Sequence, residues 1–234
     1  MAGLSKRFLD AGYSLPKYML YAGSKSIFNL TINSFKKYFG TVKFIFVARD
    51  IYDTKLFIEN ECKLMGVKDF KIIVLEQPTK GQAETVYLGL QSAHLPDNEN
   101  MLIFNIDTIR ENYTLPKYLL KHDGYLEVFK GHGKNWSYAE PYDNKSKKIR
   151  RTAEKEEISD LCSTGLYYFK RKKDFCLAFE QSCNEFDKEL YVAPLYNKLI
   201  KEGKNIYYHE IRRDEVAFTG IPAEYLQLIK GFEL

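Results

Sequence analysis

The stretch FKIIVLEQPTKGQAETVYLGLQSAHLPDNENMLIFNID, from Phe70 to Asp107, decides the fold class. Residues 70–76 and 101–106 are almost continuously apolar runs, and residues 81–93 between them have the pattern of a helix. Strands without polar alternation are typical of a parallel sheet that is covered on both faces. Ligands of such sheets bind outside the carboxyl ends of the strands, and Asp107 follows one of these ends directly.

The same alternation of strands and helices continues on both sides of this stretch. Residues 26–39 and 54–66 predict helices, the second ending at a helix-stopping glycine, and residues 42–48 predict a strand. The later part of the chain predicts strands at 124–130, 136–143, 147–155, 164–170 and 205–211, with helices at 174–186, 190–203 and 223–232. We therefore expect a doubly wound α/β fold, with a mainly parallel sheet, helices on both faces and a small β-rich lobe.

The composition excludes several classes of protein. The chain has 234 residues, 45% of them hydrophobic, which suits one globular domain spanning residues 1–234. The net charge of +4 comes from 35 basic and 31 acidic residues, and acids closely follow the basic clusters at 144–151 and 170–175, which disfavours nucleic-acid binding. No apolar run is long enough to span a membrane, and the four cysteines and four histidines lack zinc-site spacing. A soluble cytoplasmic protein is the expectation.

Two segments offer chemistry for phosphate and metal binding. The N-terminal segment MAGLSKRFLDAGYSLPKYML contains Gly3 and the cations Arg7 and Lys17, which suit a loop that cradles phosphate oxygens, although such a segment by itself is more often an ordinary loop. The carboxylate of Asp107 can bind Mg²⁺, because hard cations prefer oxygen ligands. Its alternative role is to cap or turn the chain after the strand.

Two further segments have the residue types that recognise bases and acceptors. In residues 76–86 the amides of Gln77 and Gln82 and the backbone at Gly81 can read the edge of a base, or can simply cap the strand–helix junction. In residues 153–169, Lys155 can bind a phosphate and Glu154 can bind hydroxyls or an amine, or both can belong to a solvated turn.

In this order, the four segments resemble the sugar-phosphate nucleotidyltransferases, the family of the nucleotide-sugar pyrophosphorylases. The closing segment FTGIPAEYLQL, from Phe218 to Leu228, is similar to the Gly-x-Pro helix entry of that family, so the resemblance covers nearly the whole chain. It implies a Rossmann-like nucleotidyltransferase fold with a nucleotide-binding half at 1–122 and an acceptor-binding half at 123–234. It also implies Mg²⁺-dependent transfer of a nucleoside monophosphate from a nucleoside triphosphate to a phosphorylated small acceptor, with release of pyrophosphate.

The resemblance implies a role for each matching residue. Ala2, Gly3, Leu4 and Ser5 would bind the triphosphate, Arg7 the departing pyrophosphate, Lys17 the α-phosphate and Asp107 the Mg²⁺ ion. Gln77, Gly81 and Gln82 would read the base, Lys155 would hold the acceptor phosphate, and Glu154 and Gly165 would line the acceptor pocket.

The chain departs from the family pattern at two places. Many members have a second metal-binding aspartate two residues before the closing glycine, where this chain has Phe218, so either Asp214 or Glu215 substitutes for it or Asp107 binds the metal alone. The family also has an apolar strand just before the glycine-rich loop, and this chain opens on the loop. We expect that strand upstream of Met1.

The substrates are less constrained by the sequence than the reaction. Recognition by amides and backbone is compatible with a pyrimidine base, which favours CTP. The segment EEISDLCSTGLYYF, from Glu156 to Phe169, resembles family members of capsule and surface-polysaccharide synthesis, some of which activate acceptors such as phosphoglutamine. The alternative is a non-catalytic regulator that binds a nucleotide or a sugar on the same fold. The exposed aromatic residues that we expect would allow a homo-oligomer.

Overall fold

The computed structural model describes residues 1–3, 5–143, 145–183 and 189–232. The chain divides into two compact units, each built from segments that are far apart in the sequence. Unit 1 contains Met1–Thr79, Ile106–Tyr113 and Val216–Leu234, and unit 2 contains Lys80–Asn105 and Thr114–Glu215. The expectation of one domain with two functional halves, and that of a strand upstream of Met1, remain predictions.

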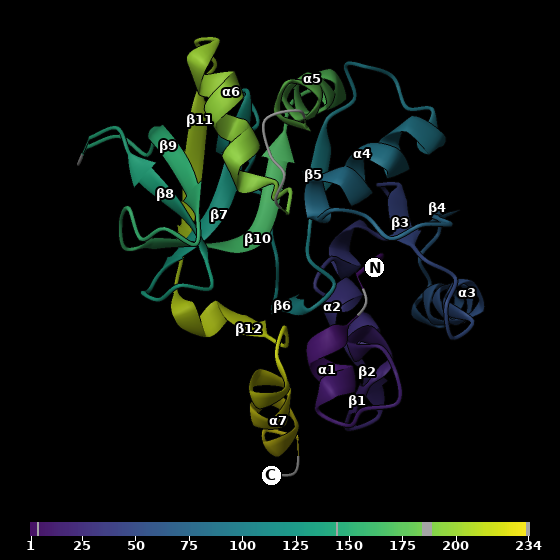
Figure 1. Ribbon diagram of the computed structural model, residues 1–234. Coiled ribbons are helices and arrows are strands. Elements are labelled where there is room, and N and C mark those ends of the chain that lie inside the picture. The colour runs from purple at the N-terminus through teal and green to yellow at the C-terminus, as the bar shows by residue number, and fades with distance from the viewer. Residues whose placement is uncertain (4, 144, 184–188, 233–234) are drawn as a thin grey trace. The chain divides into compact units, whose positions relative to one another are not determined.

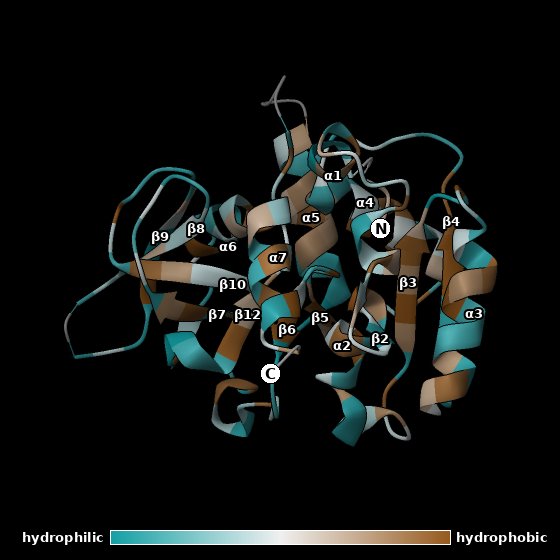
Figure 2. Ribbon diagram, turned by 90° about the horizontal axis from the view of Figure 1, so that it is seen from below, coloured by the Kyte–Doolittle hydropathy of each residue, from teal (hydrophilic) through white to brown (hydrophobic). Residues whose placement is uncertain are grey.

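Unit 1 contains a parallel pair of strands joined by a helix. Strand β3 (Phe44–Ala48) pairs with β4 (Phe70–Val74) in the register Phe44↔Phe70 to Ala48↔Val74. Figure 2 shows β3 as hydrophobic along its length. Helix α3 (Thr54–Met65) connects the two strands and ends at Gly66, whose φ of 77° is the left-handed conformation that glycine favours.

The other elements of unit 1 come from all three of the chain segments that form it. They are α1 (Lys6–Asp10), η1 (Lys17–Met19), β1 (Tyr21–Ala22), β2 (Lys25–Ser26), α2 (Ile27–Asn33), η2 (Lys36–Tyr38), β6 (Thr108–Arg110), β12 (Val216–Phe218) and α7 (Pro222–Lys230). Ser26 caps α2, because its Oγ accepts the N–H of Asn29 at 3.0 Å. A small core of Phe8, Ala22, Ile27 and Tyr225 joins the N-terminal segment to α7.

Unit 2 contains a six-stranded sheet. Its order is β11 (Ile206–Ile211), β7 (Gly124–Lys130), β10 (Leu161–Phe169), β8 (Ser137–Pro141) and β9 (Ile149–Glu154), and β5 (Met101–Ile103) also pairs with β10. Strand β11 is parallel to β7, while β5 and β7 are both antiparallel to β10. Strands β5, β7 and β11 therefore run in the same direction, and β10 is the reversed strand among them.

Helices α4 (Gln82–Ala93), α5 (Lys172–Cys183) and α6 (Tyr196–Lys201) pack with this sheet (Figure 1). Short helical turns lie at η3 (Lys117–Leu119), η4 (Ala193–Leu195) and η5 (Arg213–Glu215). The core is aromatic: Phe169 of β10 meets Phe175 of α5 edge-on at 5.2 Å and stacks on Tyr196 of α6 at 4.6 Å. The hydroxyl of Tyr196 donates to the carbonyls of Tyr125 and Tyr168, both at 2.8 Å, which satisfies the polar group in the core.

The structure confirms the α/β class. In the six-stranded sheet, β5, β7, β8 and β11 run in one direction and β9 and β10 run in the other, so most strands share a direction although only the β7–β11 pair in this sheet is parallel. The antiparallel β8–β9 pair forms the β-rich lobe. The helix expected at 190–203 was too long, because η4 with Pro194 precedes α6. Part of the helix expected at 174–186 lies outside the described residues. The antiparallel β6–β12 pair was not predicted. No helix in the described part of the chain has the length and hydrophobicity needed to cross a membrane.

Candidate functional site

Asp107 lies in unit 1 between β5 and β6, and its backbone is fixed by the closing segment of the chain. The carbonyl of Asp107 accepts two hydrogen bonds from Thr219, from the backbone N–H at 2.8 Å and from Oγ1 at 3.0 Å. The pairing of β6 with β12 continues this connection, with Thr108 opposite Phe218. Residues more than a hundred positions apart therefore position the carboxylate of Asp107.

The side chain of Asp107 forms an ion pair with Lys17 through Oδ2. Lys17 begins the turn η1 after Pro16, and its backbone N–H donates to Ser5 Oγ at 3.4 Å, which links it to the glycine-rich segment. Burial by itself would raise the pKa of Asp107, but the ammonium of Lys17 outweighs it and lowers the pKa below its usual value. The structure thus holds a cation on an ionised carboxylate, and it brings together two of the three residues expected to act in catalysis.

This arrangement is compatible with Mg²⁺. In the described residues no three His, Cys, Asp or Glu side chains gather as a metal-binding group. Mg²⁺ does not need such a group, because proteins commonly bind it with one or two carboxylates while substrate phosphates and waters supply the other oxygens. The ammonium of Lys17 shows that the environment of Asp107 accepts positive charge.

A second carboxylate, that of Glu224, lies near Asp107 across Gly220. A Cβ built on Gly220 would lie 3.2 Å from Asp107 Oδ2 and 3.6 Å from Glu224 Oε2. Glu224 belongs to the first turn of α7, and its Oε2 accepts the backbone N–H groups of Gly220 at 2.8 Å and Ile221 at 3.2 Å. The sequence interpretation missed Glu224, although an acid in the first turn of a helix after the closing glycine was a visible signal.

The N-terminal segment forms a short helix where a loop was expected. Ser5 has a φ of 48°, and its carbonyl accepts the N–H groups of Phe8 and Leu9, so that α1 begins directly after the glycine-rich residues. Arg7 lies exposed on α1, Gly3 is exposed and Ala2 is buried. Leu4 lies outside the described residues. Gln77 is exposed in the bend that follows β4.

In unit 2, Gly81 sits against the backbone of Leu190. Its φ of 153° and ψ of −177° are typical of glycine, and a Cβ there would lie 2.4 Å from the carbonyl oxygen of Leu190. Two hydrogen bonds fix this contact: Leu190 N donates to Lys80 O and Ala83 N donates to Leu190 O, both at 3.0 Å. The loop expected to read the base is therefore held rigidly on the segment before η4.

Asn105 connects two of the predicted site residues. Gln82 Nε2 donates to Asn105 Oδ1 at 2.5 Å, and a Cβ on Gly165 would lie only 2.2 Å from Asn105 Nδ2. Gly165 has a φ of 88° and lies where the register of β10 with β7 shifts. The structure thus brings Gln82 and Gly165 to the same amide, which the sequence interpretation did not include.

Glu154 ends β9 and Lys155 follows it directly, and both are held by partners that the sequence did not indicate. Glu154 accepts a hydrogen bond from Ser137 Oγ, and burial raises its pKa. Lys155 has a φ of 59°, and its side chain donates to the hydroxyl of Tyr191, which in turn donates to Glu189. The ammonium of Lys155 also lies 4.6 Å from the centre of the Tyr191 ring. Both predicted acceptor residues are thus positioned by side chains of unit 2.

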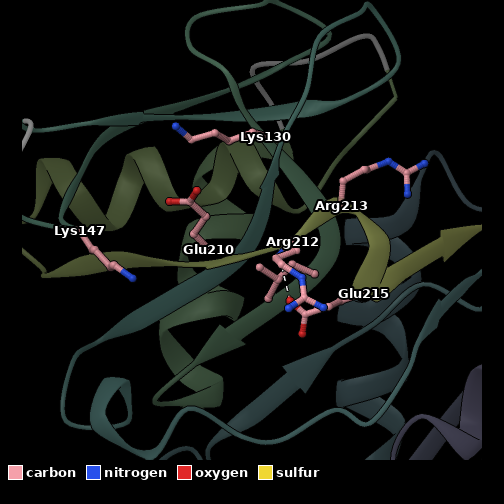
Figure 3. Close-up of a pocket in the computed structure, with 7 residues that line it drawn as sticks. Lys130, Lys147, Glu210, Arg212, Arg213 and Glu215 are labelled. Carbon is pink, nitrogen blue, oxygen red and sulfur yellow. Dashed lines mark hydrogen bonds between the residues drawn. The ribbon is translucent and has the colours of Figure 1, made fainter.

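The remaining metal-ligand candidates, Asp214 and Glu215, lie on η5 and have partners in the same turn. Asp214 accepts a hydrogen bond from Arg212 Nε at 3.0 Å, and Glu215 accepts the backbone N–H of Arg212 at 2.9 Å. Glu215 lines an open cavity of about 390 Å³ with Lys130, Lys147, Glu210, Ile211, Arg212 and Arg213 (Figure 3). This cavity includes none of the nucleotide- or acceptor-binding residues expected in unit 2.

Solved structures provide the comparison with known proteins, since no family model and no curated protein matches the chain. A nucleoside-diphosphate-sugar pyrophosphorylase from Vibrio cholerae RC9 is 46% identical, with 98% of each chain covered and a TM-score of 0.94. A putative glucose-1-phosphate thymidylyltransferase from Bacillus anthracis is 18% identical, covering 98% of this chain and 92% of its own, with a TM-score of 0.76. The inositol-1-phosphate CTP transferase from T. maritima is 15% identical, with coverage of 99% and 93% and a TM-score of 0.73. The last two likenesses concern the fold alone.

Proposed function

The chain belongs to the family of the nucleoside-diphosphate-sugar pyrophosphorylases, and we propose that it transfers a nucleoside monophosphate from a nucleoside triphosphate to a phosphorylated small molecule. The ion pair of Lys17 with Asp107 carries this proposal, because it places a cation suited to a phosphate next to a carboxylate suited to a metal ion. The 46% identity with the Vibrio cholerae protein over 98% of both chains supports it.

In the proposed reaction, an oxygen of the acceptor phosphate attacks the α-phosphorus of the triphosphate, and the bond to the β-phosphate oxygen breaks to release pyrophosphate. Lys17 exchanges its contact with Asp107 for one with the α-phosphate, where its charge stabilises the developing negative charge. Arg7, exposed on α1, binds the departing pyrophosphate together with the backbone of Ala2, Gly3, Leu4 and Ser5. Mg²⁺, held by Asp107, would neutralise phosphate charge and make the phosphorus more electrophilic.

The residues of unit 2 bind the acceptor and part of the base in this proposal. Lys155, directed by Tyr191, binds the acceptor phosphate, and Glu154 accepts hydrogen bonds from acceptor hydroxyls or an amine. Gly165 lets the amide of Asn105 pack directly against its backbone, and this amide lines the acceptor pocket. The backbone at Gly81, with Gln82 and Gln77, reads the base, and this amide-rich recognition favours CTP among the triphosphates.

We propose sugar-1-phosphates or phosphoglutamine-like molecules as acceptors, in the cytoplasmic synthesis of capsule or another surface polysaccharide. A second candidate is a non-catalytic nucleotide- or sugar-binding regulator. One observation favours it, since Phe218 occupies the position at which the family's second metal-binding aspartate is expected.

A pyrophosphate-release assay with Mg²⁺ distinguishes the two functions. Four triphosphates are tested against a panel of sugar-1-phosphates and phosphorylated amino acids, and we expect at least one pair to turn over. Asp107→Asn should reduce kcat by about 100-fold or more, because it removes the charge that binds the metal. Asp69→Asn is the matched control, since Asp69 forms an exposed pair with Lys43 at 3.7 Å.

The result that decides against catalysis is the absence of pyrophosphate with every pair, combined with measurable nucleotide binding. Full activity of Asp107→Asn would show that the reaction does not depend on this carboxylate.

A further inference from the structure

The closing segment of the chain lacks an aspartate two residues before Gly220, yet it places another acid beside Asp107. We propose that Glu224 supplies the second carboxylate of the Mg²⁺ site and compensates for Phe218. This inference rests on the proposed function, because it assigns a residue to the metal that the reaction needs.

Gly220 brings the two carboxylates close to the same point. The position of its absent Cβ lies within 3.6 Å of both Asp107 Oδ2 and Glu224 Oε2. The neighbouring Thr219 is held on the carbonyl of Asp107 by two hydrogen bonds, so that Gly220 cannot move away from Asp107 without breaking them. A Cβ at this position would crowd Asp107 Oδ2 and would touch Glu224 Oε2 at ordinary contact distance, so both acids lie next to the backbone of Gly220.

The contacts of Glu224 fix its direction and leave it ligand capacity. Both backbone N–H groups that it accepts, from Gly220 and Ile221, bind the same oxygen, Oε2. Among the described residues, no other residue donates a hydrogen bond to Glu224 Oε1 or to Asp107 Oδ1. Each carboxylate therefore has one oxygen to which no other described residue donates, although the backbone N–H of Asp107 also bonds its own carboxylate.

The charges near Asp107 favour this assignment once the nucleotide binds. In the structure the ammonium of Lys17 balances the charge of Asp107. When Lys17 moves to the α-phosphate, Asp107 loses its counterion, and Glu224 adds a second negative charge near it. One or two carboxylates are the usual protein share of a Mg²⁺ site whose other ligands are phosphates and waters, and Asp107 with Glu224 would supply two. A helix cap alone would not require Glu224 to lie beside Asp107.

The test is a titration of the full chain with Mn²⁺ alone. The electron paramagnetic resonance signal of free Mn²⁺ measures how much of the metal the protein has bound. Glu224→Gln keeps an oxygen that can cap α7 but removes the charge. We expect the Mn²⁺ affinity to fall about tenfold or more, as it does when residues that support a metal ligand are removed. At one Mn²⁺ concentration, the metal should also raise the Tm of the wild type by more than that of Glu224→Gln.

Glu84→Gln is the matched control, because Glu84 accepts the backbone N–H of Lys80, four residues earlier, as Glu224 accepts that of Gly220. It should lose a similar cap and keep the wild-type Mn²⁺ affinity. Equal affinities of Glu224→Gln and the wild type, or no Mn²⁺ binding by the wild type, would overturn the inference.

The same variants separate this inference from the proposed function. Turnover in the pyrophosphate assay with an unchanged Mn²⁺ affinity of Glu224→Gln would refute the role of Glu224 and leave the reaction standing. A Mn²⁺ affinity that depends on Glu224, in a chain without turnover, would support the metal site and refute the reaction.

Discussion

Replacing Gly81 by alanine tests whether the close contact of this residue with Leu190 holds the predicted base-reading loop. The φ of 153° and ψ of −177° lie in a region that is nearly exclusive to glycine, at a cost of about 1–3 kcal/mol for other residues. The new Cβ would also lie 2.4 Å from Leu190 O and 2.7 Å from Leu190 N. These are backbone atoms that two hydrogen bonds hold in place, so the clash adds roughly 1–3 kcal/mol.

The free energy of unfolding is measured in urea, with the fluorescence of the single tryptophan, Trp136, as the signal of unit 2. Gly203→Ala is the matched control in the same unit, because Gly203 has a φ of 80° and no atom within 4 Å of its absent Cβ. It should lose only the backbone term of about 1–2 kcal/mol. Gly81→Ala should lose at least about 1 kcal/mol more, because of the added clash.

Kinetics provide the functional half of this prediction. If the loop at Gly81 reads the base, Gly81→Ala should raise the KM for the nucleotide, whereas Gly203→Ala should leave it unchanged. A Gly81→Ala protein that is as stable as Gly203→Ala would refute the steric reasoning. If Gly81→Ala lowers the free energy of unfolding as expected but leaves the nucleotide KM unchanged, the role of the loop in reading the base is refuted.

Two further predictions concern the acceptor side and the thiols. Tyr191→Phe removes the hydroxyl that accepts a hydrogen bond from Lys155 Nζ. Because Lys155 is half-exposed, we expect the acceptor KM to rise only about three- to tenfold, at an unchanged nucleotide KM. An unchanged acceptor KM would contradict the idea that Tyr191 positions Lys155. At pH 8 a thiol reagent should modify Cys183 in the native chain and leave Cys62 unmodified, because Cys62 is buried and burial raises its pKa to about 12. Rapid modification of Cys62 would contradict its burial.

The fold was largely predictable because its strands and helices have strong local signals. The run from Phe44 to Ala48 is apolar without interruption, and Gly66 ends α3 as expected. The pairing of β6 with β12 was not predictable, since three-residue strands carry little periodicity and their partners are distant in the sequence. The break at Pro194 could have been read from the sequence, because proline is typical of the first turn of a helix.

The candidate site was predictable in its residue types and less so in its contacts. The chemistry of Asp107 and Lys17 indicated that both bind a phosphate or its metal, and the structure brings the two side chains together. No local signal predicted Asn105 or Tyr191, because each acts by touching a residue from a distant segment. Roles that depend on tertiary contacts between polar side chains have no periodic pattern in the sequence.

Three glycines of the candidate site have one physical feature in common, which Gly3 does not share, because no atom lies within 4 Å of its absent Cβ. Gly81, Gly165 and Gly220 each lie where a Cβ would approach a polar group of another segment: a backbone carbonyl, an amide and two carboxylates, respectively. Gly66 and Gly203 differ, because open space surrounds the positions of their absent Cβ atoms, as expected for residues whose left-handed φ angles only end a helix. Close approach therefore adds to the backbone conformation at Gly81 and Gly165, whose φ angles are 153° and 88°. Since close approach at Gly220 concerns the acids themselves, this glycine links the second carboxylate, Glu224, to Asp107.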